Sequence, residues 1–83
     1  MDLEKLFNQA VEGVRHIERP SNENLLKLYG LFKQATEGDV KGDRPGGFDF
    51  KAIAKYDSWS SLRGMSKEEA MQTYIDLVDS LSK

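Results

Sequence analysis

Apolar residues recur every three or four positions in four stretches of the chain, which is the spacing of one face of an α-helix. The first stretch carries Leu3, Leu6, Phe7, Ala10, Val11, Val14 and Ile17. This stripe predicts a helix of about 15 residues. The helix should end before Arg19, because Pro20 disfavours the helical conformation of the residue that precedes it.

The second apolar stretch predicts a helix that begins after Ser21 and runs to about Thr36. Ser21 is suited to cap its start, and Gly38 is suited to end it. The apolar residues of this stretch are Leu25, Leu26, Leu28, Tyr29, Leu31, Phe32 and Ala35. They cover a wider arc than contact with one core requires, so this helix has apolar surface to spare.

Residues 38–47 contain four glycines and one proline and predict the one long loop of the protein. A glycine-rich loop can cradle phosphate, but the pattern GxxxxGK[ST] is absent and no strand precedes these residues. A loop that crosses over a helical bundle is therefore the better interpretation.

Two further helices follow the loop. Asp49 is suited to cap a third helix that carries Ile53, Tyr56, Trp59 and Leu62 and stops at Gly64. Residues 66–69, Ser-Lys-Glu-Glu, form a capping box for a fourth helix. The apolar side of that fourth helix comprises Ala70, Met71, Tyr74, Ile75, Leu77, Val78 and Leu81.

Together these stretches predict an all-α fold, a four-helix bundle with a long loop between helices two and three. Eighty-three residues are enough for a single domain, and we expect it to span residues 1–83. A domain of this size buries only roughly 60–65% of the surface that its unfolded chain exposes, so an apolar side chain left outside would be informative.

Composition narrows the possible functions. Twelve Lys and Arg against 14 Asp and Glu give a net charge of −2, which argues against nucleic-acid binding. With no cysteine and one histidine, neither a disulfide framework nor a structural zinc site is expected. No apolar run approaches the length of a membrane span or a signal peptide, so we expect an intracellular protein without stable membrane insertion.

Catalysis has little support in the sequence. His16 is the only histidine, there is no Cys nucleophile, and His16 near the end of a helix is more simply explained by its favourable interaction with the helix dipole. Acidic pairs such as Asp76 with Asp79 fall on the solvated face of helix four and do not indicate a metal site. We therefore expect no catalytic residues, no metal and no cofactor.

A more specific pattern combines cations with aromatic rings. Tyr29 and Lys33 lie four residues apart on helix two, Lys51 and Lys55 lie four apart on helix three, and Arg15 is on helix one. An acidic protein that gathers cations and rings in this way could hold a multiply phosphorylated ligand with a flat ring. The alternative is a helical protein-interaction module without a small-molecule ligand, whose groove would be the spare apolar surface of helix two.

The sequence resembles the acyl-CoA-binding protein family over nearly its whole length. The matching segments are Val14-Arg15-His16, Tyr29-Gly30-Leu31-Phe32-Lys33-Gln34-Ala35-Thr36, Gly38-Asp39-Val40, Arg44-Pro45-Gly46, Ala54-Lys55-Tyr56-Asp57-Ser58-Trp59 and residues 66–75. Strings of this length at fixed separation are far more specific than any single element.

The resemblance implies an up-down-down-up bundle that carries medium- and long-chain acyl-CoA without consuming it. It places acyl-CoA against Arg15, Tyr29, Gly30, Leu31, Phe32, Lys33, Lys51, Lys55 and Tyr74. Of these, Tyr29, Lys33, Lys55 and Tyr74 are implied to contact the 3′-phosphate and adenine. It places the acyl chain in a groove along Val14, Leu25 and Leu26. From it we expect a cytoplasmic monomer that forms and carries an acyl-CoA pool.

Three positions depart from the pattern of the family. Phe32 stands where a second tyrosine is common, and Tyr56 replaces a common tryptophan. The link between His16 and Pro20 is one residue shorter than usual. These departures bear on affinity and chain-length preference more than on the class of ligand.

Overall fold

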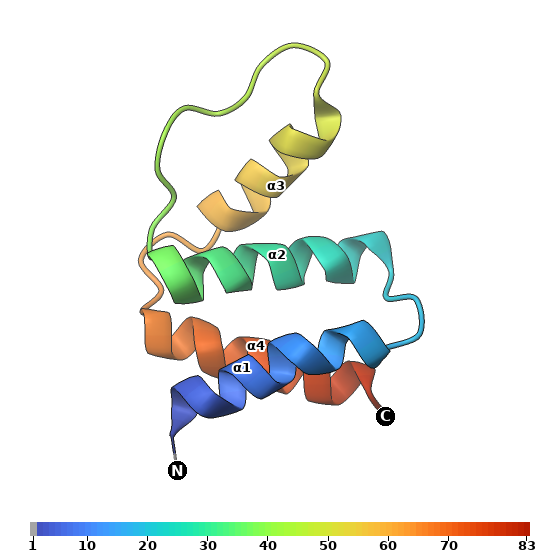
Figure 1. Cartoon of the computed structure of the whole chain (residues 1–83). Coiled ribbons are helices and arrows are strands. Elements are labelled where there is room, and N and C mark those ends of the chain that lie inside the picture. Colours follow the sequence, from blue (N-terminus) through green and yellow to red (C-terminus); the bar gives the residue numbers. More distant parts are fainter. Residues whose placement is uncertain (1) are drawn as a thin grey trace.

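The computed structural model describes residues 2–83, which form four α-helices, a single 3₁₀ turn and no strand. In chain order the elements are α1 (Leu3–Gly13), the 3₁₀ turn η1 (Val14–His16), α2 (Asn22–Glu37), α3 (Phe50–Ser60) and α4 (Lys67–Leu81). Figure 1 shows that α1 and α4 run in one direction and that α2 and α3 run in the other. The predicted all-α, up-down-down-up arrangement is confirmed.

Each α-helix begins at a side chain that accepts a hydrogen bond from a backbone N–H of the first turn, as an N-cap does. The three caps expected from the sequence are confirmed: Ser21 accepts from Asn24, Asp49 from Ala52, and Ser66 from Glu69, at 3.0–3.1 Å. Asp2 caps α1 in the same way by accepting from Glu4 at 3.0 Å. Gly38 ends α2 with a φ of 83°, a backbone conformation that glycine adopts without strain.

The first helix is shorter than the sequence pattern predicted. Its α-helical part ends at Gly13, and the chain tightens into η1 before it turns back toward α2. Arg19 follows with a φ of 39°, which makes it the only non-glycine residue of positive φ within residues 2–83. The short link to Pro20 thus places an arginine in a conformation that L-residues rarely adopt.

The third helix also ends early, at Ser60 and not at Gly64. The next residues make i to i+3 hydrogen bonds, from Leu62 N–H to the Trp59 carbonyl and from Arg63 N–H to the Ser60 carbonyl. Gly64 has a φ of 93° and donates its N–H to Asp39 Oδ1 at 2.9 Å. A contact with the α2–α3 loop therefore sets the end of this helix, which periodicity alone could not predict.

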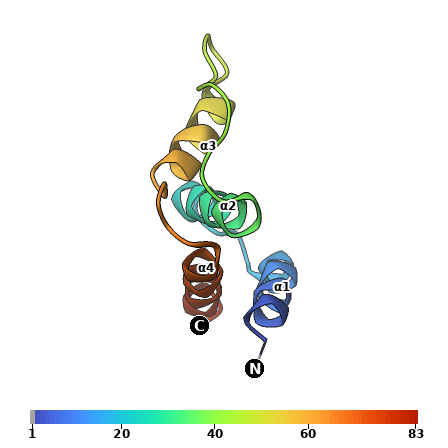
Figure 2. The same ribbon diagram turned by 90° about the vertical axis from the view of Figure 1, so that its left-hand side faces the viewer.

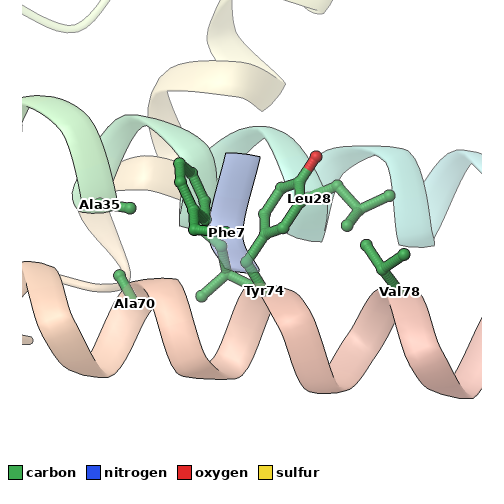
Figure 3. Close-up of a cluster of buried hydrophobic side chains, with 7 residues drawn as sticks. Phe7, Leu28, Ala35, Ala70, Tyr74 and Val78 are labelled. Atoms are coloured by element: carbon green, nitrogen blue, oxygen red, sulfur yellow. The ribbon is translucent and has the colours of Figure 1, made fainter. Parts of the chain in front are cut away.

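The apolar core lies between α1, α2 and α4, and Figure 3 shows it in the layer between α2 and α4. Its buried members are Phe7, Leu28, Leu31, Ala35, Ala70, Tyr74 and Val78. By contrast, α3 packs mainly against α2 (Figure 2). One side of α2 faces the core, and another side carries α3.

The contact between α2 and α3 is very close because α2 has a glycine at the crossing. Gly30 is buried against Ser58, and a Cβ at position 30 would lie 2.7 Å from Ser58 Oγ and 2.9 Å from its carbonyl oxygen. Ser58 Oγ also donates to the Leu26 carbonyl at 2.5 Å. The α2–α3 crossing thus combines a tight backbone approach with a hydrogen bond across the interface.

Gln34 joins the end of α2 to the start of the α2–α3 loop and to the link between α3 and α4. This side chain is fully buried, and its Nε2 donates to Asp39 Oδ1 at 2.9 Å and to the Met65 carbonyl at 2.8 Å. The hydrogen bonds from Gly64 and Gln34 to Asp39 lower the pKa of that carboxyl below its ordinary value. One polar cluster therefore holds the start of the α2–α3 loop against the link that leads into α4.

Gly30→Ala should destabilise the protein, because the new methyl group meets Ser58 backbone atoms that cannot move without shifting α3. We expect the free energy of unfolding to fall by about 1–3 kcal/mol, the usual cost of overpacking. Urea denaturation followed by circular dichroism measures this change.

Gly13→Ala is the matched control for this substitution. Gly13 has a helical φ of −62°, and the nearest atom to its added Cβ would be a Val78 methyl carbon at 4.0 Å. This variant should be as stable as the parent or slightly more stable. Equal stability of the two variants would contradict a tight crossing at Gly30.

Candidate functional site

A pocket of about 450 Å³ lies between α2 and α3. It is lined by Asn22, Leu25, Leu26, Tyr29, Phe50, Lys51, Ala54 and Lys55. Five of these residues belong to the site predicted from the sequence, and they include both cationic and apolar members. The pocket therefore brings cationic, aromatic and apolar side chains together.

The lining follows from helix geometry. One face of α2 carries Asn22, Leu25, Leu26 and Tyr29. Leu25 and Leu26 each lie three or four positions from both Asn22 and Tyr29, which is the spacing of neighbours on a helix surface. The core residues of α2 occupy a different face of the same helix. The apolar arc that exceeded the needs of one core is thus divided between the core and this pocket, and Leu25 remains 46% exposed there.

Lys55 lies over the ring of Tyr29, with Nζ 5.4 Å from the ring centroid. This is cation–π geometry, and it joins a residue of α3 to a residue of α2. Lys51 lies one turn earlier on α3 and lines the same pocket. Two lysines from α3 and one aromatic ring from α2 therefore line the same pocket.

Lys33 is engaged within the protein. Its ammonium group forms an ion pair with Glu37, one helical turn further along α2, and lies 4.9 Å from the centroid of the Trp59 ring. The hydrogen bond between the two side chains raises the pKa of Lys33 and lowers the pKa of Glu37. Glu37 thus occupies the position that an anionic ligand group would take beside Lys33.

The long loop is fastened along α3 by three sets of side-chain contacts. Trp59 Nε1 donates to the Gly38 carbonyl at 2.7 Å, and the Tyr56 hydroxyl donates to the Gly42 carbonyl at 3.1 Å. Arg44 makes two hydrogen bonds to the Asp57 carboxylate, at 2.8 and 2.9 Å, which lower the pKa of that carboxyl. The loop and α3 therefore form one unit, of which α3 lines the pocket.

Four residues predicted for the site lie away from this pocket, in or beside the α1 region or the core. Arg15 is largely exposed and lies 3.8 Å from Glu12 in an ion pair, and Val14 packs against the core cluster from η1. Phe32 stacks on Phe7 of α1, with ring centroids 6.0 Å apart. The fourth, Tyr74, is buried in the core.

Tyr74 packs its ring edge-to-face on Phe7 at 5.1 Å, and only 4% of the residue is exposed (Figure 3). Burial raises the pKa of its hydroxyl. Leu31 is buried on the far side of α2, where it lines a second hollow between α2, α3 and α4. Gly30 is enclosed at the α2–α3 crossing.

The structure adds residues that the sequence reasoning did not assign to the site. Asn22, Phe50 and Ala54 line the pocket, and Glu37 pairs with Lys33. The four-residue spacing from Lys33 to Glu37 was a signal that could have identified this ion pair. Likewise Asn22 lies four residues before Leu26, and Ala54 three residues after Lys51, so helix spacing could have placed both beside the predicted site.

Comparison with known proteins covers most of the chain. The family model for acyl-CoA binding protein matches residues 4–78. The acyl-CoA-binding protein homolog of Manduca sexta is 47% identical, covering 98% of this chain and 92% of that protein. Enoyl-CoA delta isomerase 2 of Rattus norvegicus is 48% identical over 92% of this chain, but the match spans only 20% of the enzyme.

The fold agrees with the sequence comparison. The crystal structure of Oryza sativa acyl-CoA-binding protein 2 superposes with a TM-score of 0.94 at 44% identity, covering 98% of this chain and 91% of that one. The family match, the sequence relatives and the structural likeness all include α2 and α3, the two helices that line the pocket. The chain belongs to the acyl-CoA-binding protein family.

Proposed function

We propose that this protein binds medium- and long-chain fatty acyl-CoA esters and carries them in the cytoplasm, as a monomer, without chemical change. One observation carries the proposal: a single pocket between α2 and α3 is lined by Lys55, whose ammonium group lies over the ring of Tyr29, by Lys51 and by two leucines. An acyl-CoA ester has matching parts, with phosphates and adenine for the cations and the ring, and an alkyl chain for the leucines.

The head of the ligand would bind where Lys51 and Lys55 adjoin Tyr29. Charge-assisted hydrogen bonds from ammonium to phosphate are stronger than neutral ones. The exposed part of the Tyr29 ring offers a face on which adenine can stack. Lys33 lies one turn beyond Tyr29 on the same face of α2, so it could bind a further phosphate once it leaves Glu37.

The acyl chain would follow the apolar part of α2. Leu25 and Leu26 line the pocket there, and the Phe50 ring extends the apolar surface from α3. Each buried methylene contributes about 0.8 kcal/mol, so tail length should govern much of the affinity. The stacking of Phe32 on Phe7 brings α1 to the other flank of this α2 face, where Val14 and Arg15 could meet the ligand.

A carrier role agrees with the chemistry of the pocket. Its eight lining residues comprise two lysines, one asparagine, one tyrosine and four apolar side chains. This set pairs no nucleophile with a general base, which covalent catalysis on a thioester would require. The proposed role is therefore binding and protection of the ester.

The test of this function is a titration series with free coenzyme A and with its esters of increasing chain length. We expect Kd, measured by isothermal titration calorimetry, to fall steadily as methylenes are added, because more apolar surface leaves water. Thiol release should stay at the rate of the uncatalysed ester. A Kd that is independent of chain length would contradict the buried tail.

Lys55→Met should weaken acyl-CoA binding by about 1–3 kcal/mol, because it removes one ammonium group and keeps the length of the side chain. The dependence of Kd on salt should become weaker as well. Lys27→Met is the control, since Lys27 lines the second hollow on the far side of α2 and pairs with Glu23 at 3.6 Å. Equal affinities of the two variants would remove Lys55 from the site.

Glu37 should oppose binding, because it competes with ligand phosphate for Lys33. The competition favours the ligand, since a Lys that precedes Glu by four residues is the weaker orientation of a helical ion pair. Glu37 is also the last residue of α2, where a negative charge is unfavourable to the helix dipole. The pair can therefore open at little cost to the fold.

Glu37→Gln should strengthen acyl-CoA binding by about two- to fivefold, the range expected for release of an exposed ion pair. Calorimetry at low salt measures the change. Glu23→Gln breaks another ion pair of α2 with four-residue spacing, the one with Lys27, and should leave affinity unchanged. If Glu37→Gln weakens binding or leaves it unaltered, Lys33 does not bind ligand phosphate.

A further inference from the structure

The most exposed large apolar side chains of the protein, within residues 2–83, are Phe48 and Phe50. Phe48 is 91% exposed and Phe50 is 70% exposed. The two rings meet edge-to-face with centroids 6.4 Å apart. In an 83-residue domain that needs nearly all of its apolar surface for the core, two adjacent exposed rings indicate a contact with something outside the chain.

Local structure holds both rings outward. Asp49 lies between them, and its side chain is turned to the backbone, where it caps α3 by accepting from Ala52 N–H at 3.1 Å. Gly46 and Gly47 precede the pair, and an added Cβ on either glycine would meet no atom within 4 Å. The rings therefore stand at an open tip, which we call the phenylalanine tip (Phe48 and Phe50).

The tip is at the extremity of the molecule. Phe48 and Phe50 lie where the long loop enters α3, at the end of α3 that Figures 1 and 2 show farthest from α4. Because α3 packs mainly on α2, the tip extends beyond the bundle. A narrow projection with apolar rings at its end suits insertion into a soft, flat surface better than it suits the broad packed core of a protein interface.

The charges beside the tip indicate what kind of surface it meets. Lys51 and Lys55 follow on α3, and Asp49 is the only carboxylate in residues 46–56. The rest of the chain has ten Lys and Arg against thirteen Asp and Glu. The tip and its flank are thus locally basic on an acidic protein, which favours anionic headgroups and turns the remainder of the protein away from them.

We propose that the phenylalanine tip docks on a lipid bilayer that contains anionic headgroups. The rings of Phe48 and Phe50 enter the interfacial region, and the α3 lysines remain at the level of the headgroups. Two rings and two cations give weak and reversible binding, in contrast to a membrane span. No helix within residues 2–83 is long and apolar enough to cross a membrane.

Docking at the tip has a consequence for the pocket. Phe50 belongs both to the tip and to the lining of the α2–α3 pocket, so a docked tip brings the pocket to the bilayer surface. This consequence, unlike the docking itself, rests on the proposed function. An acyl ester could then pass between lipid and pocket with little exposure of its tail to water.

The docking is tested on the full chain without acyl-CoA, by co-sedimentation with phosphatidylcholine vesicles that contain or lack phosphatidylserine. We expect the protein to bind the anionic vesicles. Binding should be weaker to neutral vesicles, and weaker to anionic vesicles at high salt. Phe48→Ser should reduce the partition coefficient about tenfold, because it removes the more exposed ring. Ser at a 91% exposed position does not disturb the core.

Phe48→Trp supplies a second readout. Trp59 is buried, so a blue shift of emission on addition of anionic vesicles, with quenching by brominated lipid, reports entry of residue 48 into the bilayer. Unshifted emission, or equal partition of Phe48→Ser and the parent chain, would overturn the proposal. So would parent-chain dimers that Phe48→Ser abolishes, because the tip would then pack against a second copy.

Acyl-CoA affinity separates this inference from the proposed function. Phe48 does not line the pocket, so Phe48→Ser should keep the Kd of the parent chain while it loses vesicle binding. Failure of vesicle binding with intact acyl-CoA affinity would reject the docking alone. If the parent chain has no measurable affinity for acyl-CoA, the carrier function is rejected and the docking result is unaffected.

Discussion

The contact between Gly30 and Ser58 is the constraint on which the rest of the site depends. A Cβ at position 30 would lie 2.7 Å from Ser58 Oγ, and α2 is the main helix against which α3 packs. A side chain at position 30 would separate the two helices and widen the pocket between them. The hydrogen bond from Ser58 to the Leu26 carbonyl adds a directional link at the same place, beside a residue that lines the pocket. The width of the site is thus set by a missing Cβ and one hydroxyl group.

The polar contacts around the loop complete this arrangement. Gln34 and Asp39 hold the start of the loop near the α3–α4 link, while Arg44 and Tyr56 hold its middle against α3. The loop needs few apolar residues of its own, because hydrogen bonds and one bidentate ion pair keep it in place. This explains how a segment with four glycines and a proline can keep a defined path along α3.

Local features of the fold could be predicted from the sequence, and features set by distant contacts could not. The caps at Ser21, Asp49 and Ser66 depend on residues within three positions, so reading the sequence found them. The early ends of α1 and α3 depend on a tightened turn and on the bond from Gly64 to Asp39, which no periodic pattern encodes. In the site, the resemblance to the family named Tyr29, Leu25 and Leu26, and all three line the pocket. It also placed Tyr74 at the ligand, whereas helix spacing had put this residue on the apolar side of helix four, and its ring lies inside the core against Phe7.

The placement of α3 outside the core has a consequence for cooperativity. All seven members of the core cluster lie on α1, α2 and α4, so these three helices keep their apolar interior if α3 and the loop detach. Local opening of this kind exposes amides of α3 to hydrogen exchange at a free energy below that of global unfolding. A ligand that bridges α2 and α3 would close this opening and protect those amides selectively. The stability of α3 and the loop, the least stable part of the fold, would then report whether the ligand is bound.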